Sequence, residues 1–239
     1  IEMRTVPITY DHPSLDIEAA INACDENTIC IVPIAGVTWT GMNDDIEGLN
    51  DALDKYNKKT GYDIPIHVDA ASGGFILPFL NPEKKWDFRL KWVKSISTSG
   101  HKYGLVYPGL GWVIWRDKDY LPAEMSFSVN YLGANITQVG LNFSRPAAQV
   151  LGQYYNFIHL GMDGYRAIHA NSMDIAHYCH HAIGRAIGIV RLVQHGTVVG
   201  GIAHANQDLF SQFCQQGPGG NTFGNTLGLH IQNPGRGPE

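Results

Sequence analysis

The stretch VKSISTSGHKYG, residues Val93–Gly104, joins a short strand-like run to a loop bounded by glycines. The run VKSIST contains β-branched residues, which favour a strand. The loop SGHKYG contains Ser99, His101 and Lys102. A lysine in such a loop is usually a solvated surface residue, because Lys is seldom buried. Whether Lys102 has a chemical role therefore depends on which residues the neighbouring segments bring to it.

Outward from this stretch, strand-like and helical segments alternate. Short apolar runs predict strands, and amphipathic segments with caps at their ends predict helices. Strands are expected at residues 28–34 (TICIVPI), 64–69 (IPIHVD), 93–98 and 109–116 (GLGWVIWR), and helices at 15–27, 43–61, 144–161 and 163–181. This alternation predicts βαβ units and a largely parallel sheet covered on both faces.

Polar residues follow each of the first three predicted strands. Thr38 lies in the segment after TICIVPI, Asp69 ends IPIHVD, and His101 and Lys102 follow VKSIST. In open α/β sheets, functional groups gather at the carboxyl ends of the strands. We therefore expect a hydroxyl, a carboxylate and a His-Lys pair at one edge of the sheet.

Several common chemistries do not fit these residues. SGHKYG lacks the spacing of a Walker A loop, and YPGLGW leads into a strand, unlike a dinucleotide fingerprint. No G-x-S-x-G elbow is present for a serine hydrolase. A lysine beside a histidine, with a carboxylate on a neighbouring strand end, suits a Schiff base to pyridoxal 5'-phosphate (PLP). There the carboxylate pairs with the pyridinium nitrogen.

Four longer blocks make the pattern specific: HVDAASGGF, DFRLKWVKSISTSGHKYG, GWVIWRD and NFSRPAAQV. Together they resemble glutamate decarboxylase, of the group II PLP-dependent decarboxylases, over roughly residues 1–178. The resemblance implies the fold-type I PLP-dependent transferase large domain, an α/β fold with a mostly parallel sheet flanked by helices, here incomplete. It also implies decarboxylation of L-glutamate to 4-aminobutanoate and CO2.

The resemblance assigns roles to individual residues of this chain. Lys102 corresponds to the lysine that forms the Schiff base, and Asp69 to the partner of the pyridinium nitrogen. His101 and Ser99 correspond to residues on the phosphate side of the cofactor. The two remaining cofactor contacts are Ala71, whose methyl packs on the ring, and Thr38, beside the ring and the substrate.

The resemblance also implies a homodimer or higher oligomer. Residues 126–146 are similar to the family's mobile segment near the active site and the dimer interface. Phe143 and Ser144 are candidate contacts with a neighbouring subunit's site, whereas Arg145 fits an ordinary ion-pair residue at a helix start equally well.

Simpler interpretations stay open for some of these residues. Asp69 fits the cap of a following helix, and the hydroxyls of Thr38 and Ser99 fit turn caps. His177 and His181 lie four residues apart on a predicted helix, but no acidic residue or third ligand has suitable spacing, so we expect no metal site. The aromatic residues of QYYNFIHL are expected to pack in the core or an interface.

Composition excludes several classes of protein. The chain of 239 residues is 44% hydrophobic and 16% charged, as expected for a globular protein with a sizeable core. Its net charge of −5 and lack of a Lys/Arg block argue against binding nucleic acid. The longest apolar run, ICIVPIAGVTW, is broken by Pro33 and too short to cross a bilayer. The four cysteines show no C-x-x-C pairing, and we expect reduced thiols in a cytoplasmic protein.

The end of the chain differs from the rest. Residues 183–239 contain 12 of the 27 glycines and no lysine. We therefore expect residues 1–182 to form part of a PLP-binding large domain, and residues 183–239 to be an atypical tail, out of frame or disordered. Two further alternatives stay open: a truncated, non-catalytic chain, and a group II decarboxylase that acts on another amino acid.

Overall fold

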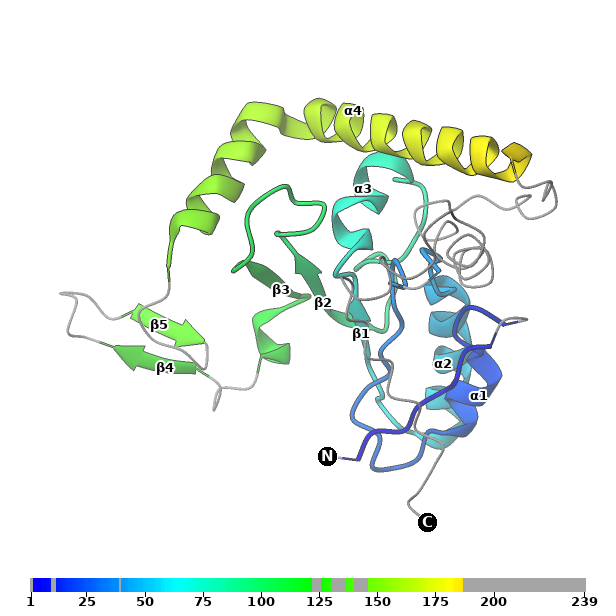
Figure 1. Cartoon of the computed structure of the whole chain (residues 1–239). Helices are drawn as coiled ribbons and strands as arrows, with labels where there is room; N and C mark the ends of the chain where they lie inside the picture. Colours follow the sequence, from blue (N-terminus) through cyan, green and yellow to red (C-terminus); the bar gives the residue numbers. More distant parts are fainter. Residues whose placement is uncertain are drawn as a thin grey trace, which may run out of the picture.

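A computed structural model describes residues 2–9, 12–38, 40–121, 126–129, 136–139 and 146–186. In chain order its elements are α1 (Ile17–Asn22), α2 (Ile46–Thr60), β1 (Ile66–Asp69), the 3-10 turn η1 (Gly73–Phe75), α3 (Leu77–Leu80), β2 (Val93–Ser99), β3 (Gly111–Trp115), the 3-10 turn η2 (Lys118–Tyr120), β4 (Ser126–Val129), β5 (Ile136–Val139) and α4 (Ala148–Ala186). Figure 1 shows β1, β2 and β3 at the centre, with α1 and α2 on one side and α4 across one end.

The central sheet is mixed. Its order is β1-β2-β3, with β1 parallel to β2 and β2 antiparallel to β3. The segment predicted as the first strand is extended and pairs in parallel with β1, through bridges from Ile31 to Ile66 and from Ile34 to Asp69. Pro33 lies between these bridges and has no N–H to donate. The proline therefore interrupts the ladder and leaves two separate bridges instead of a continuous strand.

The longest helix beside the sheet, α2, ends at Gly61 as predicted and begins at Ile46, later than the predicted start at residue 43. The side chain of Asp45 accepts a hydrogen bond from the Gly48 N–H and caps the first turn. Glu47 lies in the first turn and Lys58 and Lys59 in the last, an arrangement that complements the helix dipole. The helix ends at Gly61, which has the left-handed φ of 80° common after a helix.

The core lies between α2 and one face of the sheet. Leu49 and Leu53 of α2 are fully buried, as are Ile66 and Val68 of β1. With Ile96 of β2 they belong to one cluster of buried apolar side chains. Burying an aliphatic side chain of this size contributes about 1.5–3 kcal/mol. This cluster therefore fixes which face of the sheet turns inward.

Helix α4 is bent at Gly161, where two predicted helices meet. Gly161 has φ 56° and ψ −165°, outside the helical region, and the bend is visible at the top of Figure 1. Aromatic rings pack beneath the bend: Phe79 stacks on Tyr165 with centroids 4.9 Å apart, and Phe157 lies 6.2 Å from Phe75. Phe157 therefore contributes to packing, as predicted, whereas Tyr154 and Tyr155 of the same stretch are 64% and 61% exposed. These ring contacts join the first half of α4 to η1 and the second half to α3.

The remaining predictions on structure have different outcomes. The sheet contains parallel pairs as expected, but β3 runs antiparallel to β2. Pro146 precedes α4, which begins at Ala148. Phe143, Ser144 and Arg145, and the tail beyond residue 186, lie outside the described residues. In the described part of the chain, no helix has the length and apolarity needed to cross a membrane.

Candidate active site

Four of the predicted site residues are joined by a continuous set of hydrogen bonds at the carboxyl ends of β1 and β2. Asp69 Oδ1 accepts a hydrogen bond of 3.0 Å from the Ala71 N–H. The Ala71 carbonyl accepts one of 3.2 Å from the Ser99 N–H, and the Ser99 carbonyl accepts one of 3.2 Å from the Lys102 N–H. The backbone around Asp69, Ala71, Ser99 and Lys102 is therefore held as one unit.

Lys102 is exposed and its side chain reaches toward the loop after β1. Its Nζ donates a hydrogen bond of 3.4 Å to Ser72 Oγ. Ser72 was not predicted as a partner of this lysine, although it lies in the same VDAASGG stretch as Asp69. A weak contact with a single hydroxyl leaves the amine available to react with a ligand.

A cavity of 550 Å³ lies beside Lys102. Its walls come from residues 36–38, 41 and 43, from the segments 72–81 and 102–105 and from the second half of α4, and both Thr38 and Lys102 line it. Asp69, Ala71, Ser99 and His101 do not line this cavity. The structure thus brings Thr38 and Lys102 to one cavity, whereas the other four are not part of its lining.

His101 contacts the far end of its own loop. Its Nδ1 donates to the carbonyl of Leu110, 3.2 Å away, just before β3, and its ring is exposed. Lys102 and His101 therefore reach to opposite sides of the loop, Lys102 toward β1 and His101 toward β3.

One face of the sheet carries a strip of polar side chains that sequence reasoning missed. His67 lies two residues before Asp69 on β1, so the two side chains share a face. His67 Nδ1 lies 2.6 Å from Ser95 Oγ and its Nε2 lies 3.3 Å from Ser97 Oγ. Burial lowers the pKa of His67, an effect that the Asp69 carboxylate partly opposes. The alternation H-x-D and S-x-S is the signal that could have predicted this strip.

The wall that α4 contributes to the cavity also contains a buried histidine. His169 is 2% exposed, and its ring lies among Phe79, Tyr103 and Tyr165. Burial lowers the pKa of His169, and a hydrogen bond with the Tyr103 backbone opposes that shift. Among the described residues, no group of three His, Cys, Asp or Glu side chains could hold a metal ion.

Comparison with known proteins identifies similar sequences in one family. Residues 1–199 match the family described as pyridoxal-dependent decarboxylase conserved domain. The chain is 54% identical over 183 residues to glutamate decarboxylase beta of Listeria innocua, covering 77% of this chain and 39% of that protein. It is 54% identical over 176 residues to glutamate decarboxylase 5 of Arabidopsis thaliana, covering 74% of this chain and 36% of that protein. The chain therefore spans about two fifths of the length of the curated relatives that it matches.

Solved structures agree with the sequence match. A glutamate decarboxylase of Lactobacillus brevis superposes with a TM-score of 0.70 at 53% identity, over 73% of this chain and 40% of that one. A sphingosine-1-phosphate lyase of Burkholderia pseudomallei has a TM-score of 0.53 at 29% identity, over 66% and 36% of the two chains. The expected fold, part of the fold-type I large domain, is confirmed. Because the family match extends over most of its length, the chain belongs to the pyridoxal-dependent decarboxylase family.

Proposed function

We propose that this chain is the part of a PLP-dependent L-glutamate decarboxylase that contains the cofactor-binding lysine. The parent reaction would convert L-glutamate to 4-aminobutanoate and CO2. The observation that carries the proposal is the hydrogen-bonded unit from Asp69 to Lys102, in a chain about half identical to glutamate decarboxylases.

The residues present fit PLP in charge and size. Asp69 uses Oδ1 for the Ala71 N–H, and the structure gives its Oδ2 no hydrogen bond among the described residues. That oxygen suits a cationic ring nitrogen. Ala71 is small enough to let a flat ring approach, and the exposed amine of Lys102 suits an aldehyde.

When bound, PLP supplies an electron sink for the negative charge left at Cα as CO2 departs. Lys102 would hold the cofactor through its Nζ and release it to the amine of the substrate. The Asp69 carboxylate would keep a proton on the ring nitrogen, because an opposite charge favours the ionised form. Thr38 would lie beside the ring and the substrate, with His101 and Ser99 on the phosphate side.

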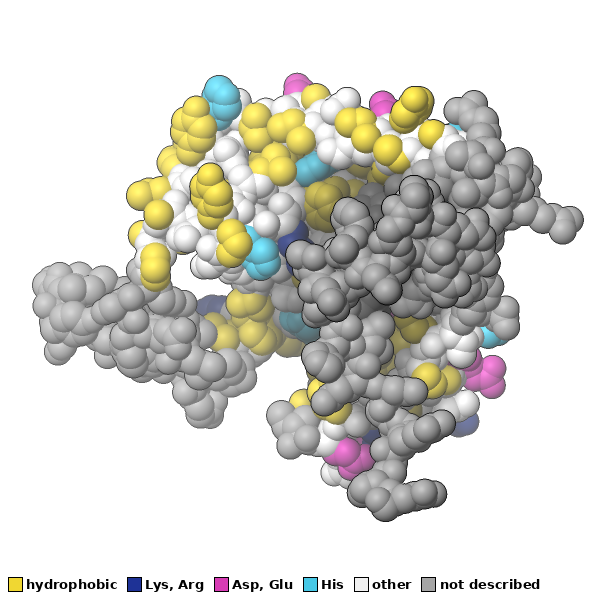
Figure 2. Space-filling view, in the orientation of Figure 1, with side chains coloured by type: hydrophobic (Ala, Val, Ile, Leu, Met, Phe, Trp, Pro, Cys, Tyr) yellow, Lys and Arg dark blue, Asp and Glu magenta, His cyan; other side chains and the backbone are white. Residues whose placement is uncertain are grey.

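We also infer that the parent protein is a cytoplasmic homo-oligomer that binds neither nucleic acid nor membrane. The described cysteines Cys24, Cys30 and Cys179 are free thiols, which suits a reducing compartment. Apolar side chains are exposed along α4, as the yellow groups in Figure 2 show, with Leu151 66% and Ile158 67% exposed. Such a surface suits contact with a second subunit.

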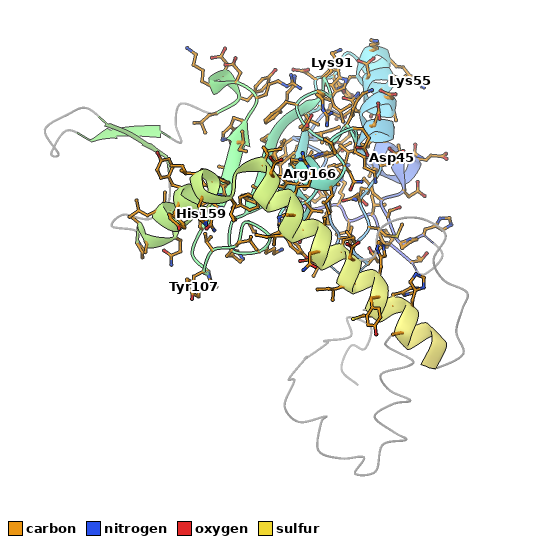
Figure 3. The ribbon with its side chains drawn as sticks, turned by 90° about the horizontal axis from the view of Figure 1, so that it is seen from above. Asp45, Lys55, Lys91, Tyr107, His159 and Arg166 are labelled. Atoms are coloured by element: carbon orange, nitrogen blue, oxygen red, sulfur yellow. The ribbon has the colours of Figure 1, made fainter. Side chains whose placement is uncertain are left out.

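The test uses the purified chain with PLP, followed by reduction with borohydride and peptide mass spectrometry. We expect the phosphopyridoxyl group on Lys102, and its loss in Lys102→Ala. The matched control is Lys55→Ala, because Lys55 is exposed on α2 (Figure 3) and should not affect labelling. Equal labelling of many surface lysines, unchanged in Lys102→Ala, would refute the proposal.

A second arm of the test measures CO2 release from labelled L-glutamate and from other amino acids in the presence of PLP. Release from L-glutamate alone supports the glutamate assignment, and faster release from another amino acid would replace it. Labelling of Lys102 without CO2 release would identify the chain as a cofactor-binding part that needs the rest of the protein for turnover.

A further inference from the structure

The loop that contains Lys102 lacks regular structure of its own. It runs from the end of β2 at Ser99 to the start of β3 at Gly111. Two of its residues have positive φ: Leu105 at 63° and Gly109 at 120°. A leucine in the left-handed region is strained by an amount on the order of 1 kcal/mol, so contacts from outside the loop must stabilise it.

Those contacts come from side-chain amides on the first half of α4. Gln149 Nε2 donates to the Pro108 carbonyl at 3.0 Å, Gln153 Nε2 to the Gly104 carbonyl at 2.8 Å, and Asn156 Nδ2 to the Leu105 carbonyl at 2.9 Å. These residues are spaced four and three apart, so they share one face of the helix. In Figure 3, Tyr107 of the loop and His159 of α4 lie at the same end of the molecule.

A second donor reaches the Gly104 carbonyl from beyond the bend. Tyr165 Oη donates to that carbonyl at 2.9 Å and accepts a hydrogen bond of 2.9 Å from Gln153 Nε2. Gln153 is 0% exposed and Tyr165 is 1% exposed. The positive φ of Gly161 between them redirects the helix, so that side chains from both halves of α4 meet at one atom.

The packing around this carbonyl is tight. A Cβ at Gly104 would lie 2.7 Å from Gln153 Oε1, and one at Gly100 would lie 2.6 Å from the same oxygen. Both glycines that flank His101 and Lys102 are therefore in close contact with one glutamine. Lys102 therefore lies between two glycines, Gly100 and Gly104, that both pack against Gln153 of α4.

We propose that Gln153 and Tyr165 are positioning residues for Lys102, which they hold by clamping the Gly104 carbonyl from both sides of the α4 bend. The proposal rests on the proposed role of Lys102 as the residue that binds PLP. The Lys102 amine ends a flexible side chain, so its effective concentration at a bound aldehyde depends on how well the backbone is fixed. The clamp lies two residues away and supplies that constraint.

The first test measures limited trypsin cleavage after Lys102 in three variants without cofactor. Tyr165→Phe removes only the hydroxyl, and Gln153→Leu removes the amide at similar size. Gln149→Leu is the matched control, since it makes the same change one turn earlier, where the partner is Pro108. We expect cleavage to rise about 5- to 10-fold in the first two variants, as the loss of one buried hydrogen bond to the Gly104 carbonyl predicts, and to rise by less in Gln149→Leu, whose hydrogen bond to Pro108 is exposed.

The second test separates positioning from general loosening. In the first two variants we expect borohydride-trapped PLP on Lys102 to form about 5- to 10-fold more slowly, while affinity for pyridoxamine phosphate, which has no aldehyde, stays unchanged. Equal loss of both ligands, or cleavage and trapping like wild type in Tyr165→Phe, would overturn the proposal. Tyr165→Phe keeps the test decisive if Gln153→Leu does not fold. A wild-type chain that traps no PLP refutes the proposed function. The cleavage rates, measured without cofactor, still test whether Gln153 and Tyr165 hold the loop.

Discussion

The two faces of the central sheet differ in what they contact. On one face, Val68 and Ile96 belong to the same buried apolar cluster as Leu53 of α2. On the other face, His67 bonds serine hydroxyls of β2, and Asp69 presents its carboxylate beside them. The first face stabilises the fold and the second positions chemical groups. Substitutions on the two faces should therefore change different measured quantities.

The largest effect on stability is expected on the apolar face. Leu53→Ala removes a fully buried side chain and leaves a cavity, which should lower the free energy of unfolding by about 2–5 kcal/mol. Urea denaturation followed by circular dichroism measures this loss. PLP trapping per folded molecule should be unchanged. A loss below that of any polar-face variant would contradict the comparison.

A buried carboxylate at the start of α2 should have the next largest effect. Asp44 is 8% exposed and accepts hydrogen bonds from the backbone N–H of Leu15 at 2.8 Å and of Ile34 at 2.7 Å. Asp44→Asn turns one acceptor into a donor that faces an N–H group, so we expect a loss of about 1–3 kcal/mol by urea denaturation. The control is Asp45→Asn, which should change little, because Asn caps helices as well as Asp.

A smaller effect is expected from pH at His67. Burial lowers its pKa in the folded chain, so the unfolded chain takes up a proton first as the pH falls. The stability from neutral His67 is therefore present above the ordinary histidine pKa of about 6.5 and is lost below it. His169 acts in the same direction. Melting temperatures between pH 7 and 5 should fall less steeply in His67→Gln than in wild type; equal slopes would contradict the assignment.

The smallest effect on stability is expected at Asp69. Asp69→Asn keeps an oxygen for the Ala71 N–H, so the free energy of unfolding should change by less than about 0.5 kcal/mol. Affinity for PLP should nevertheless fall about 10- to 100-fold, because a charged partner of the ring nitrogen is lost. Equilibrium dialysis measures this loss, and Asp63→Asn, at an exposed position before β1, is the control. A large loss of stability with unchanged affinity would assign Asp69 to the fold instead.

Much of the fold could be predicted because local signals and burial agree. Helix α2 ends at the left-handed Gly61, as predicted, and Asp45 caps its start within the predicted segment. The strands β1 and β2 were predicted from short runs that contain β-branched residues. The antiparallel direction of β3 was not, since an apolar run reads alike in either direction. Pro33 is the signal that could have predicted the interruption of the first strand, because proline cannot donate a ladder hydrogen bond.

The site was predictable only where strand ends decide it. Asp69, Ala71, Ser99 and Lys102 come together because parallel strands end at one edge. The contacts of Gln153 and Tyr165 were not predictable, because an amide on an amphipathic helix reads as solvent-facing. Their convergence depends on the bend at Gly161, which the sequence indicates only as a helix end.

The strand β3 has a practical consequence for handling the chain. Among the described residues it pairs on one side only, with β2, and Val113 and Ile114 on it are 55% and 46% exposed. An apolar strand with unpaired backbone groups recruits extended segments of other chains, which is the first step of aggregation. Aggregation of the purified chain should therefore increase with protein concentration through β3, and Val113→Lys is expected to reduce it.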